Sequence, residues 1–305
     1  MAERWRILAA LTLARVTMAL AFQSVAALAP PMMAETGLGW GEIGTLVGAF
    51  MAPGVVAALM GGWLGQRVGA GRVAVAGLVA MALAGLVMAA VTGFAALLAA
   101  RLAVGVGAVA LNVMLTRMAA ERFPGRDLPT AMGVLSTSWP LGIALALVVL
   151  PPLGEAAGWR GAFAGTAALG LLAAAMLAAV WRPPETHGST APAGGRLTRG
   201  ETGRACLAGV IWGLYNAALI AVLAFGADLL VARGRAPVAA AAEVSGLSWA
   251  CVATLALGGW VAARTGRPGL VALASMGLTA AALAVLALVN AGAWTPALLV
   301  LAGLA

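Results

Sequence analysis

Long apolar runs separated by short polar turns occupy almost the whole chain. The runs exceed the ~18 residues that an α-helix needs to cross a bilayer, whereas a β-barrel would show short segments of alternating polarity. We therefore predict an all-α fold, a polytopic membrane helical bundle. The nine expected spans cover residues 7–29, 41–63, 72–91, 95–119, 128–150, 158–181, 205–231, 237–263 and 269–289. Residues 294–305 begin a tenth apolar run that is too short to cross.

One polar segment divides the chain. Residues 182–204 interrupt the apolar pattern with proline, glycine and arginine, a composition typical of a solvated linker. We expect a six-helix transmembrane bundle at residues 1–181, a cytoplasmic linker at 182–204 and a partial transmembrane bundle at 205–305.

Composition supports the membrane assignment. The chain is 63% hydrophobic and 9% charged, with a mean hydropathy of +1.03, which excludes an ordinary soluble domain. Every basic residue is arginine, and this usage together with abundant alanine is typical of a GC-rich bacterial gene. The arginines are scattered among short loops instead of covering one face, so we expect no nucleic-acid partner despite the net charge of +8.

The distribution of arginines also predicts the orientation. If alternate loops face the cytoplasm, most arginines lie inside, and only Arg160, Arg233 and Arg235 lie outside. Cytoplasmic loops of membrane proteins carry such an excess of positive charge. We therefore expect a multi-pass protein of the bacterial inner membrane with a cytoplasmic N-terminus.

A short basic turn occurs twice, at residues 61–72 and at residues 258–267. Both copies open with Gly-Gly-Trp and place arginine and glycine at matching offsets, which suggests a duplicated unit. Gly69 and Gly266 are expected to adopt positive φ angles, and the arginines are expected to stay in water beside anionic headgroups. The predicted conformational-switch loops contain Gly62, Gln66, Arg67, Gly69, Arg72, Gly259, Arg264 and Gly266.

The first copy of this turn resembles the signature between helices two and three of the major facilitator superfamily of secondary transporters, roughly Gly-x-Leu-Ala-Asp-Arg-x-Gly-Arg-Lys. The signature's acidic position is Gln66 here and Ala263 in the second copy, so the charge cluster attributed to that acid is missing. Arg101-x-x-x-Gly105-x-Gly107 is similar to the family's helix-four signature. The resemblance implies alternating access between two pseudo-symmetric halves around a mid-membrane solute site. It also implies helices beyond a tenth, so we expect a C-terminally incomplete chain.

Residues 136–142 place a proline, Pro140, in the middle of the fifth span, where flanking hydroxyls can compensate the freed backbone carbonyl. We expect a hinge there. Many family members have a Gly-Pro signature at this point, but Trp139 replaces the glycine, so the antiporter role of that motif is not carried over. The sequence from Gln23 to Gly54 and around Trp139 looks most like that of the cyanate-porter-like branch of the superfamily.

Intramembrane polar residues are the expected solute ligands. Arg101 shares a helical face with Gly105, Ala108 and Asn112, and a charge within a span needs a partner or water. Arg15 and Gln23 lie on the first span. Snorkelling to the headgroups is the alternative for both arginines. The further candidates are aromatic or polar residues within spans, with ordinary helix packing as their alternative: Trp139, Trp212, Tyr215, Asn216 and Trp249.

The carboxylates in the predicted spans, Asp228 and Glu243, lie near outer helix ends. A cavity lined by the arginines would therefore favour an anionic solute, while the coupling ion stays open. The transporter would be secondary active or facilitative and monomeric. The alternative is a transport-inactive, truncated membrane protein that acts as an interaction partner.

The sequence shows no motif typical of a soluble enzyme, a metal site or a nucleotide-binding site. His187 lies in the linker, and Cys206 and Cys251 fall within spans without metal-ligand spacing. The sequence contains no Gly-rich phosphate loop followed by Lys and Ser or Thr. We expect neither an enzyme nor a cofactor or metal.

Overall fold

The computed structural model describes residues 2–54, 63–124, 127–182, 198–288 and 292–304, and these residues form helices and no strand. The all-α prediction is therefore confirmed for the described part of the chain. The helices are α1 (Ala2–Ala27), α2 (Ala29–Thr36), α3 (Trp40–Ala49), α5 (Ala70–Ala90), α6 (Phe94–Arg122), α7 (Leu128–Val180), α8 (Arg199–Ala232), α9 (Pro237–Thr265), α10 (Pro268–Leu288), the 3-10 turn η2 (Gly292–Trp294) and α11 (Thr295–Leu304).

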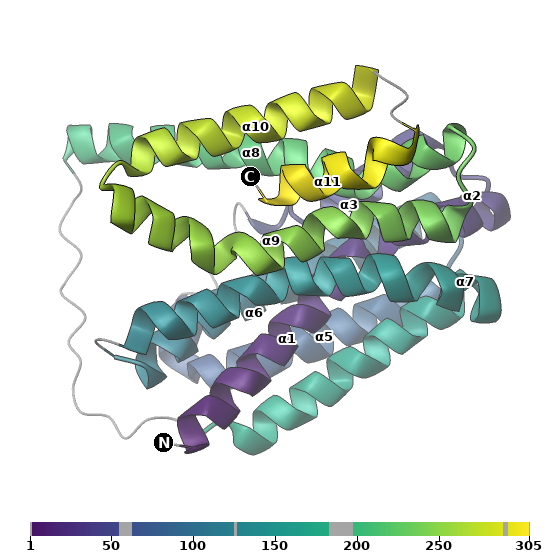
Figure 1. The fold of residues 1–305 in the computed structure, drawn as a ribbon. Coiled ribbons are helices and arrows are strands. Elements are labelled where there is room, and N and C mark those ends of the chain that lie inside the picture. The colour runs from purple at the N-terminus through teal and green to yellow at the C-terminus, as the bar shows by residue number, and fades with distance from the viewer. Residues whose placement is uncertain (1, 55–62, 125–126, 183–197, 289–291, 305) are drawn as a thin grey trace.

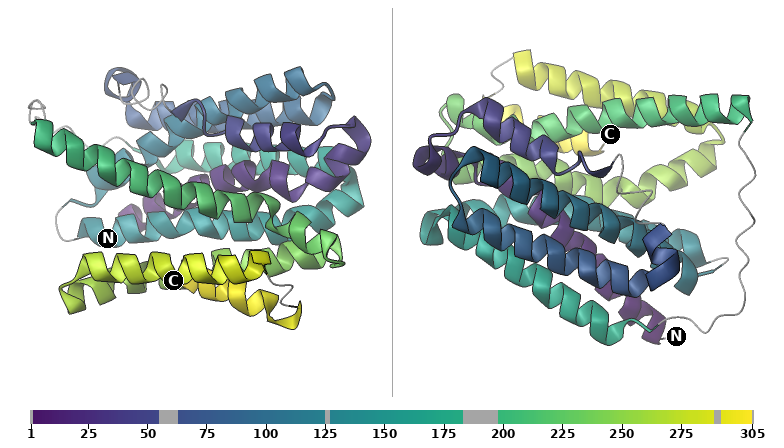
Figure 2. Two further views of the ribbon diagram at one scale, coloured as in Figure 1. Left: turned by 90° about the horizontal axis from the view of Figure 1, so that it is seen from above. Right: turned by 180° about the vertical axis from the view of Figure 1, so that it is seen from behind.

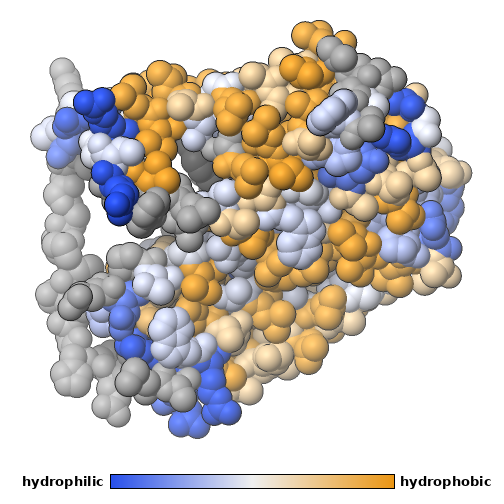
Figure 3. Space-filling model, in the orientation of Figure 1, coloured by the Kyte–Doolittle hydropathy of each residue, from blue (hydrophilic) through white to orange (hydrophobic). Residues whose placement is uncertain are grey.

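Seven described helices are long and apolar enough to cross a membrane. One of them, Thr130–Val180, covers nearly all of both the fifth and the sixth predicted spans. The second predicted span, residues 41–63, is not one continuous helix, because α3 ends at Ala49 and a turn follows at residues 50–53. Its residues 55–62 lie outside the described residues. Figure 3 shows apolar residues over the middle of the molecule and polar residues toward its two ends, as expected for a protein surrounded by lipid.

The first helix, α1, ends at Ala27, close to its predicted end at residue 29, but the predicted end of the fifth span before Pro151 was wrong. Pro30 and Pro31 lie in the first turn of α2, where backbone N–H groups have no partner within the helix, so the missing N–H of proline costs no hydrogen bond. Helix α7 continues through Pro151 and Pro152, and its direction changes at Gly158, whose backbone has φ 71° and ψ 161°. A residue with a side chain rarely adopts this positive φ, so the glycine and not the prolines sets the reversal.

The helices form two groups (Figures 1 and 2). The N-terminal lobe contains α1 to α7, and the C-terminal lobe contains α8 to α11. Helix α7 packs against α9, and α1 packs against α8, so these two pairs join the lobes. Figure 3 shows the surface hollowed between the lobes at the end where α1 begins. At that end the first half of α8 is largely exposed, with Leu214 at 68%.

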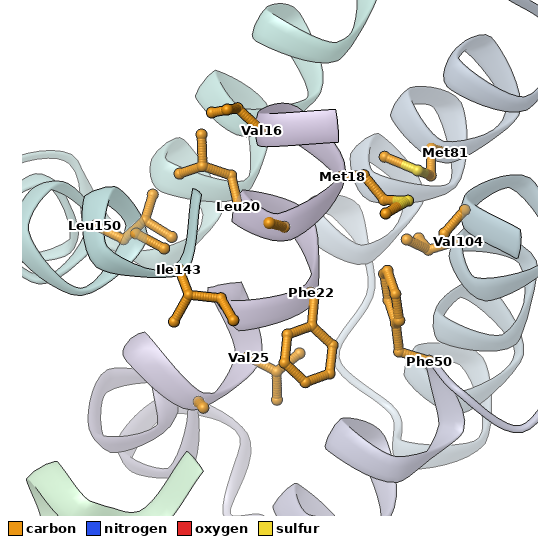
Figure 4. Close-up of a cluster of buried hydrophobic side chains, with 14 of the residues drawn as sticks. Val16, Met18, Leu20, Phe22, Val25, Phe50, Met81, Val104, Ile143 and Leu150 are labelled. Carbon is orange, nitrogen blue, oxygen red and sulfur yellow. The ribbon is translucent and has the colours of Figure 1, made fainter. Parts of the chain in front are cut away.

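The core of the N-terminal lobe surrounds α1 (Figure 4). Close backbone approaches explain several of its glycines. A Cβ on Gly77 of α5 would lie 2.7 Å from the carbonyl oxygen of Gly107 on α6. A Cβ on Gly142 of α7 would lie 2.6 Å from the carbonyl oxygen of Val16 on α1. Small residues allow membrane helices to pack at such distances.

Candidate solute site

Helix α1 carries a buried residue, Gln23, that is hydrogen-bonded to the other lobe. Gln23 is 1% exposed, and its side-chain amide donates a hydrogen bond of 2.5 Å to the carbonyl oxygen of Leu223 on α8. The acceptor is a backbone group, so breaking this bond strands no buried charge. A neutral hydrogen bond of this kind between lobes is compatible with repeated separation and contact.

Arg101 is enclosed within the N-terminal lobe, with 1% of its surface exposed. Its Nε donates to the carbonyl oxygen of Leu46 at 3.0 Å, and its two terminal nitrogens donate to those of Ala21 at 2.7 Å and Phe22 at 2.6 Å. The guanidinium carbon lies 4.8 Å from the centre of the Phe50 ring. Arginine offers five N–H donors in a planar fork, which suits three carbonyls on two helices. Arg101 thus ties α6 to both α1 and α3.

The helical face predicted around Arg101 has a packing function in the structure. Gly105 faces the backbone of Phe50, because a Cβ at this position would collide with the Phe50 carbonyl. Ala108 is buried, while Asn112 is half-buried and its Oδ1 is buried without a partner among the described residues. This face therefore seats α3 and the turn that follows it.

A cavity of about 20 Å³ lies beside Arg101, a volume sufficient for one water molecule. Its polar lining includes the buried hydroxyls of Thr17, Ser24 and Thr166. Each of these donates its hydrogen to a carbonyl of its own helix at 2.9 Å. These hydroxyl protons are therefore used within their own helices, and the hydroxyl oxygens remain available as acceptors.

Arg15 lies half-buried on α1, about 12 Å before Gln23 at 1.5 Å per residue. One terminal nitrogen donates to the carbonyl oxygen of Leu135 on α7 at 3.1 Å. Its Nε is buried and has no partner among the described residues. The described ion pairs join other residues to carboxylates, not Arg15. This guanidinium therefore has donors left for a ligand.

Three aromatic rings cluster around Phe22, the residue before Gln23. The Phe22 ring lies between those of Phe50 and Trp139, with centroids 5.3 and 5.2 Å away. Trp139 is half-buried, and the next residue, Pro140, is buried within α7. The hydroxyl of Ser138 donates to the Leu135 carbonyl that also accepts from Arg15. Arg15 therefore contacts α7 one residue before residues 136–142, the segment in which the hinge is predicted.

The candidate solute ligands of the C-terminal lobe are less buried than those around α1. Tyr215 on α8 is 39% exposed, and Trp249 on α9 is 42% exposed. Asn216 is half-buried. Trp212 lies in α8, but its side chain is outside the described residues. The structure thus gathers Arg15, Gln23, Arg101 and Trp139 around α1, whereas the other candidates lie on α8, α9 and α6.

The two switch turns confirm the expected glycine conformations. Gly69 has φ 99° and precedes α5, and Gly266 has φ 62° and ends α9. In the first turn Arg67 stacks over the Trp63 ring at 4.1 Å, while Gln66 and Arg72 are exposed. In the second turn Arg264 is exposed, and Gly259 lies within α9. Gly62 lies outside the described residues.

A second cavity lies where the lobes meet, beyond Gln23. It has a volume of about 170 Å³ and is lined by residues of α1, α2, α7, α8 and α9. Two carboxylates, Glu155 and Asp228, contribute to it, and Oδ2 of Asp228 is buried without a partner among the described residues. No group of three metal-ligating side chains occurs within the described ranges.

Sequence reasoning missed the partners of these polar residues. Leu46, Ala21, Phe22, Leu135 and Leu223 all take part through backbone carbonyl oxygens. A carbonyl carries no side-chain signature, so its use cannot be read from residue type. The predicted spans offer Arg15 and Arg101 no evident carboxylate partner, and this absence was the signal that could have indicated carbonyl partners.

The profile of the Major Facilitator Superfamily matches residues 11–305. A probable sulfoacetate transporter, SauU, from Cupriavidus necator is 28% identical over 144 residues, covering 46% of this chain and 33% of that protein. The chain thus spans about a third of the length of this curated relative.

Solved transporters share the fold. A bacterial homologue of the lysosomal transporter Spinster, inward-facing and occupied, matches 100% of this chain and 72% of its own with a TM-score of 0.77 and 20% identity. The inward-open xylose transporter XylE from E. coli matches 98% of this chain and 79% of its own with a TM-score of 0.77 and 14% identity. These proteins are transporters and not enzymes, in agreement with the expectation for this chain.

Proposed function

Because the chain belongs to the Major Facilitator Superfamily and is a multi-pass membrane protein, we propose that it moves a small solute across the membrane by alternating access, as a secondary active or facilitative transporter. The observation that carries this proposal is the bond between Gln23 and Leu223. It joins the lobes at one end, while a hollow separates them at the end where α1 begins (Figure 3). A rocking motion of the lobes would break the Gln23–Leu223 bond at one end and close the hollow at the other.

The proposed organisation keeps the three parts predicted from the sequence. Residues 1–181 form the N-terminal bundle, a cytoplasmic linker follows, and the part of the C-terminal bundle present extends to residue 305. The linker was predicted to extend to residue 204, but α8 already begins at Arg199, so the C-terminal bundle starts earlier than expected. The excess of arginine in alternate loops supports a cytoplasmic N-terminus in a bacterial inner membrane. The protein is proposed to act as a monomer.

The proposed solute is a small anion. Arg15 supports this class because its guanidinium is half-buried, donates to a single carbonyl among the described contacts and has no described carboxylate partner. Sulfoacetate, named for the relative SauU, carries a sulfonate and a carboxylate and would suit such a fork. Membership of the cyanate-porter-like branch, another group named for a small anion, is proposed with it.

In this proposal Arg15, Gln23 and Trp139 contact the solute from the N-terminal lobe, and Pro140 provides the hinge. The proposed contacts from the C-terminal lobe are Trp212, Tyr215, Asn216 and Trp249. Asn112 contributes from α6. Arg101 acts as a positioning residue, because its donors hold the backbone of α1 directly before Gln23. The turns at residues 61–72 and 258–267 are proposed to switch with the lobes.

The test is uptake of labelled sulfoacetate and of other small organic anions by liposomes that contain the purified protein. We expect Arg15→Gln to abolish uptake and Arg6→Gln to leave it unchanged. Arg6 is the matched control, because it is an exposed arginine on the same helix. Full uptake by Arg15→Gln would overturn the anion site. If no solute is transported while a membrane partner copurifies, the interaction-protein alternative would replace transport.

A further inference from the structure

A large groove lies on the N-terminal lobe, away from the contact between the lobes. It has a volume of about 1040 Å³ and lies between the first switch turn, α5, and the ends of α6 and α7. The proposed transport function does not use this groove. Its lining combines basic, aromatic and apolar side chains in a definite order along α5.

The mouth of the groove carries positive charge. Arg72 is exposed in the first turn of α5, and Arg117 lies opposite on α6. The acid in the lining, Glu121, accepts a hydrogen bond of 2.6 Å from Arg117, so its charge is compensated. The remaining polar side chain of the lining is the neutral Gln66. Nothing in this lining offsets the charge of Arg72.

The wall of the groove is an apolar stripe on α5. Val75, Val79 and Leu83 recur every four residues, so they share one face of the helix. Leu83 is 53% exposed. At 1.5 Å per residue the stripe is about 12 Å long, close to the ~15 Å half-thickness of the hydrocarbon core. Its length suits an acyl chain that descends from the headgroup level.

The glycines of the turn shape the groove at its basic end. A Cβ on Gly71 would collide with the Trp181 indole, and a Cβ on Gly65 would lie 2.5 Å from the sulfur of Met114. The guanidinium of Arg122 lies 5.3 Å from the Trp181 ring. Tryptophan and arginine together are typical of the membrane interface. The close approach of Gly71 therefore places Trp181 at the basic end of the groove.

We propose that this groove binds one anionic phospholipid of the adjacent leaflet. The phosphate contacts Arg72 and Arg117, and one acyl chain lies along Val75, Val79 and Leu83. A basic site between helices at the cytoplasmic side is the kind of site that recognises anionic headgroups. A free phosphate could use the arginines but would leave the apolar wall uncovered. The occupant is therefore the whole lipid, held beside a switch turn.

Native mass spectrometry can count bound lipids on protein purified from nanodiscs that contain phosphatidylglycerol and phosphatidylcholine. We expect one retained phosphatidylglycerol. Arg72→Gln should lower its retention about fivefold, the ratio that ~1 kcal/mol per arginine near an anionic surface implies. Arg267→Gln is the control, because Arg267 is an exposed arginine beside the second switch turn. Equal losses in both variants would indicate diffuse surface attraction and overturn the site.

A second variant separates a lipid from a free anion. Ala80→Trp fills the exposed wall without changing the charge, because Ala80 lines the groove and is exposed. We expect it to abolish phosphatidylglycerol retention while inorganic phosphate fails to compete in the unaltered protein. Retention by Ala80→Trp, or displacement by phosphate, would overturn the lipid assignment. Neither result depends on solute uptake, so the transport proposal is tested separately.

Discussion

The side-chain amide of Gln23 donates a hydrogen bond to the backbone carbonyl oxygen of Leu223, 200 positions further along the chain. Both residues are buried, and they come from different lobes. This bond lies at the end where the lobes are in contact. Arg101 of α6 donates hydrogen bonds to the neighbouring carbonyls of Ala21 and Phe22. Helix α1 is therefore bonded to its own lobe directly beside the residue that bonds to the other lobe.

Gln23→Leu should favour separation of the lobes at this end, because the variant keeps the volume but loses the donor. Spin labels at Ala156 and Ala239, exposed residues of α7 and α9, report the distance between lobes. Cys206 and Cys251 are first replaced by serine. We expect a longer distance population in Gln23→Leu and none in Thr116→Val, which alters an exposed threonine of α6. Identical distributions in all three proteins would refute a latch at Gln23.

Arg101→Lys should destabilise the N-terminal lobe by on the order of 3 kcal/mol, because a single ammonium cannot reach three carbonyls on two helices. Denaturation of the detergent-solubilised protein followed by circular dichroism measures this loss. Arg6→Lys, at an exposed position, serves as the control. A lysine variant as stable as the parent would show that the three hydrogen bonds contribute little.

Glu35 on α2 should make stability depend on acid pH. Hydrogen bonds from Arg160 and then from Trp159 hold the pKa of the Glu35 carboxyl below its usual range. A lowered folded pKa means that the stabilisation is complete above the unfolded value, about 4.3, and is lost as pH falls through the folded value. The unaltered protein should therefore have a higher Tm than Glu35→Gln at neutral pH, and the difference should vanish in acid.

The control for this titration is Glu155→Gln, which alters an exposed glutamate of α7 without a described ion pair. Its Tm should follow that of the unaltered protein at each pH. A Glu35→Gln difference that stays constant down to about pH 3 would exclude the carboxylate as its origin.

Gly142→Val should separate α1 from α7, because a Cβ at this position lies 2.6 Å from both the Val16 oxygen and the Ala19 Cβ. Overpacking of this kind destabilises by about 1–3 kcal/mol. Gly133→Ala is the matched control on the same helix, since its Cβ would meet nothing within 4 Å. Thermal denaturation of both variants measures the difference, and equal Tm values would contradict a close crossing at Gly142.

The sequence predicted the helical elements because hydrophobicity and length alone specify a membrane span. It also predicted the positive φ of Gly69 and Gly266, because a tight turn at a helix end often needs a positive φ, which glycine adopts without steric strain. It misplaced the reversal in α7, because two prolines indicate a helix end more strongly than Gly158 does. The enclosure of Arg101 could not be predicted, because carbonyl partners from distant helices leave no residue pattern.

The carbonyl partners of Arg101 have a consequence for biosynthesis. Leu46, Ala21 and Phe22 all precede Arg101 in the chain, so they are already synthesised when the arginine emerges from the ribosome. The charge can therefore be satisfied as soon as α6 inserts, without waiting for later helices. Gln23 must instead remain without its partner until α8 is made. The N-terminal lobe is thus built in the order of translation, while its bond to the second lobe is added last.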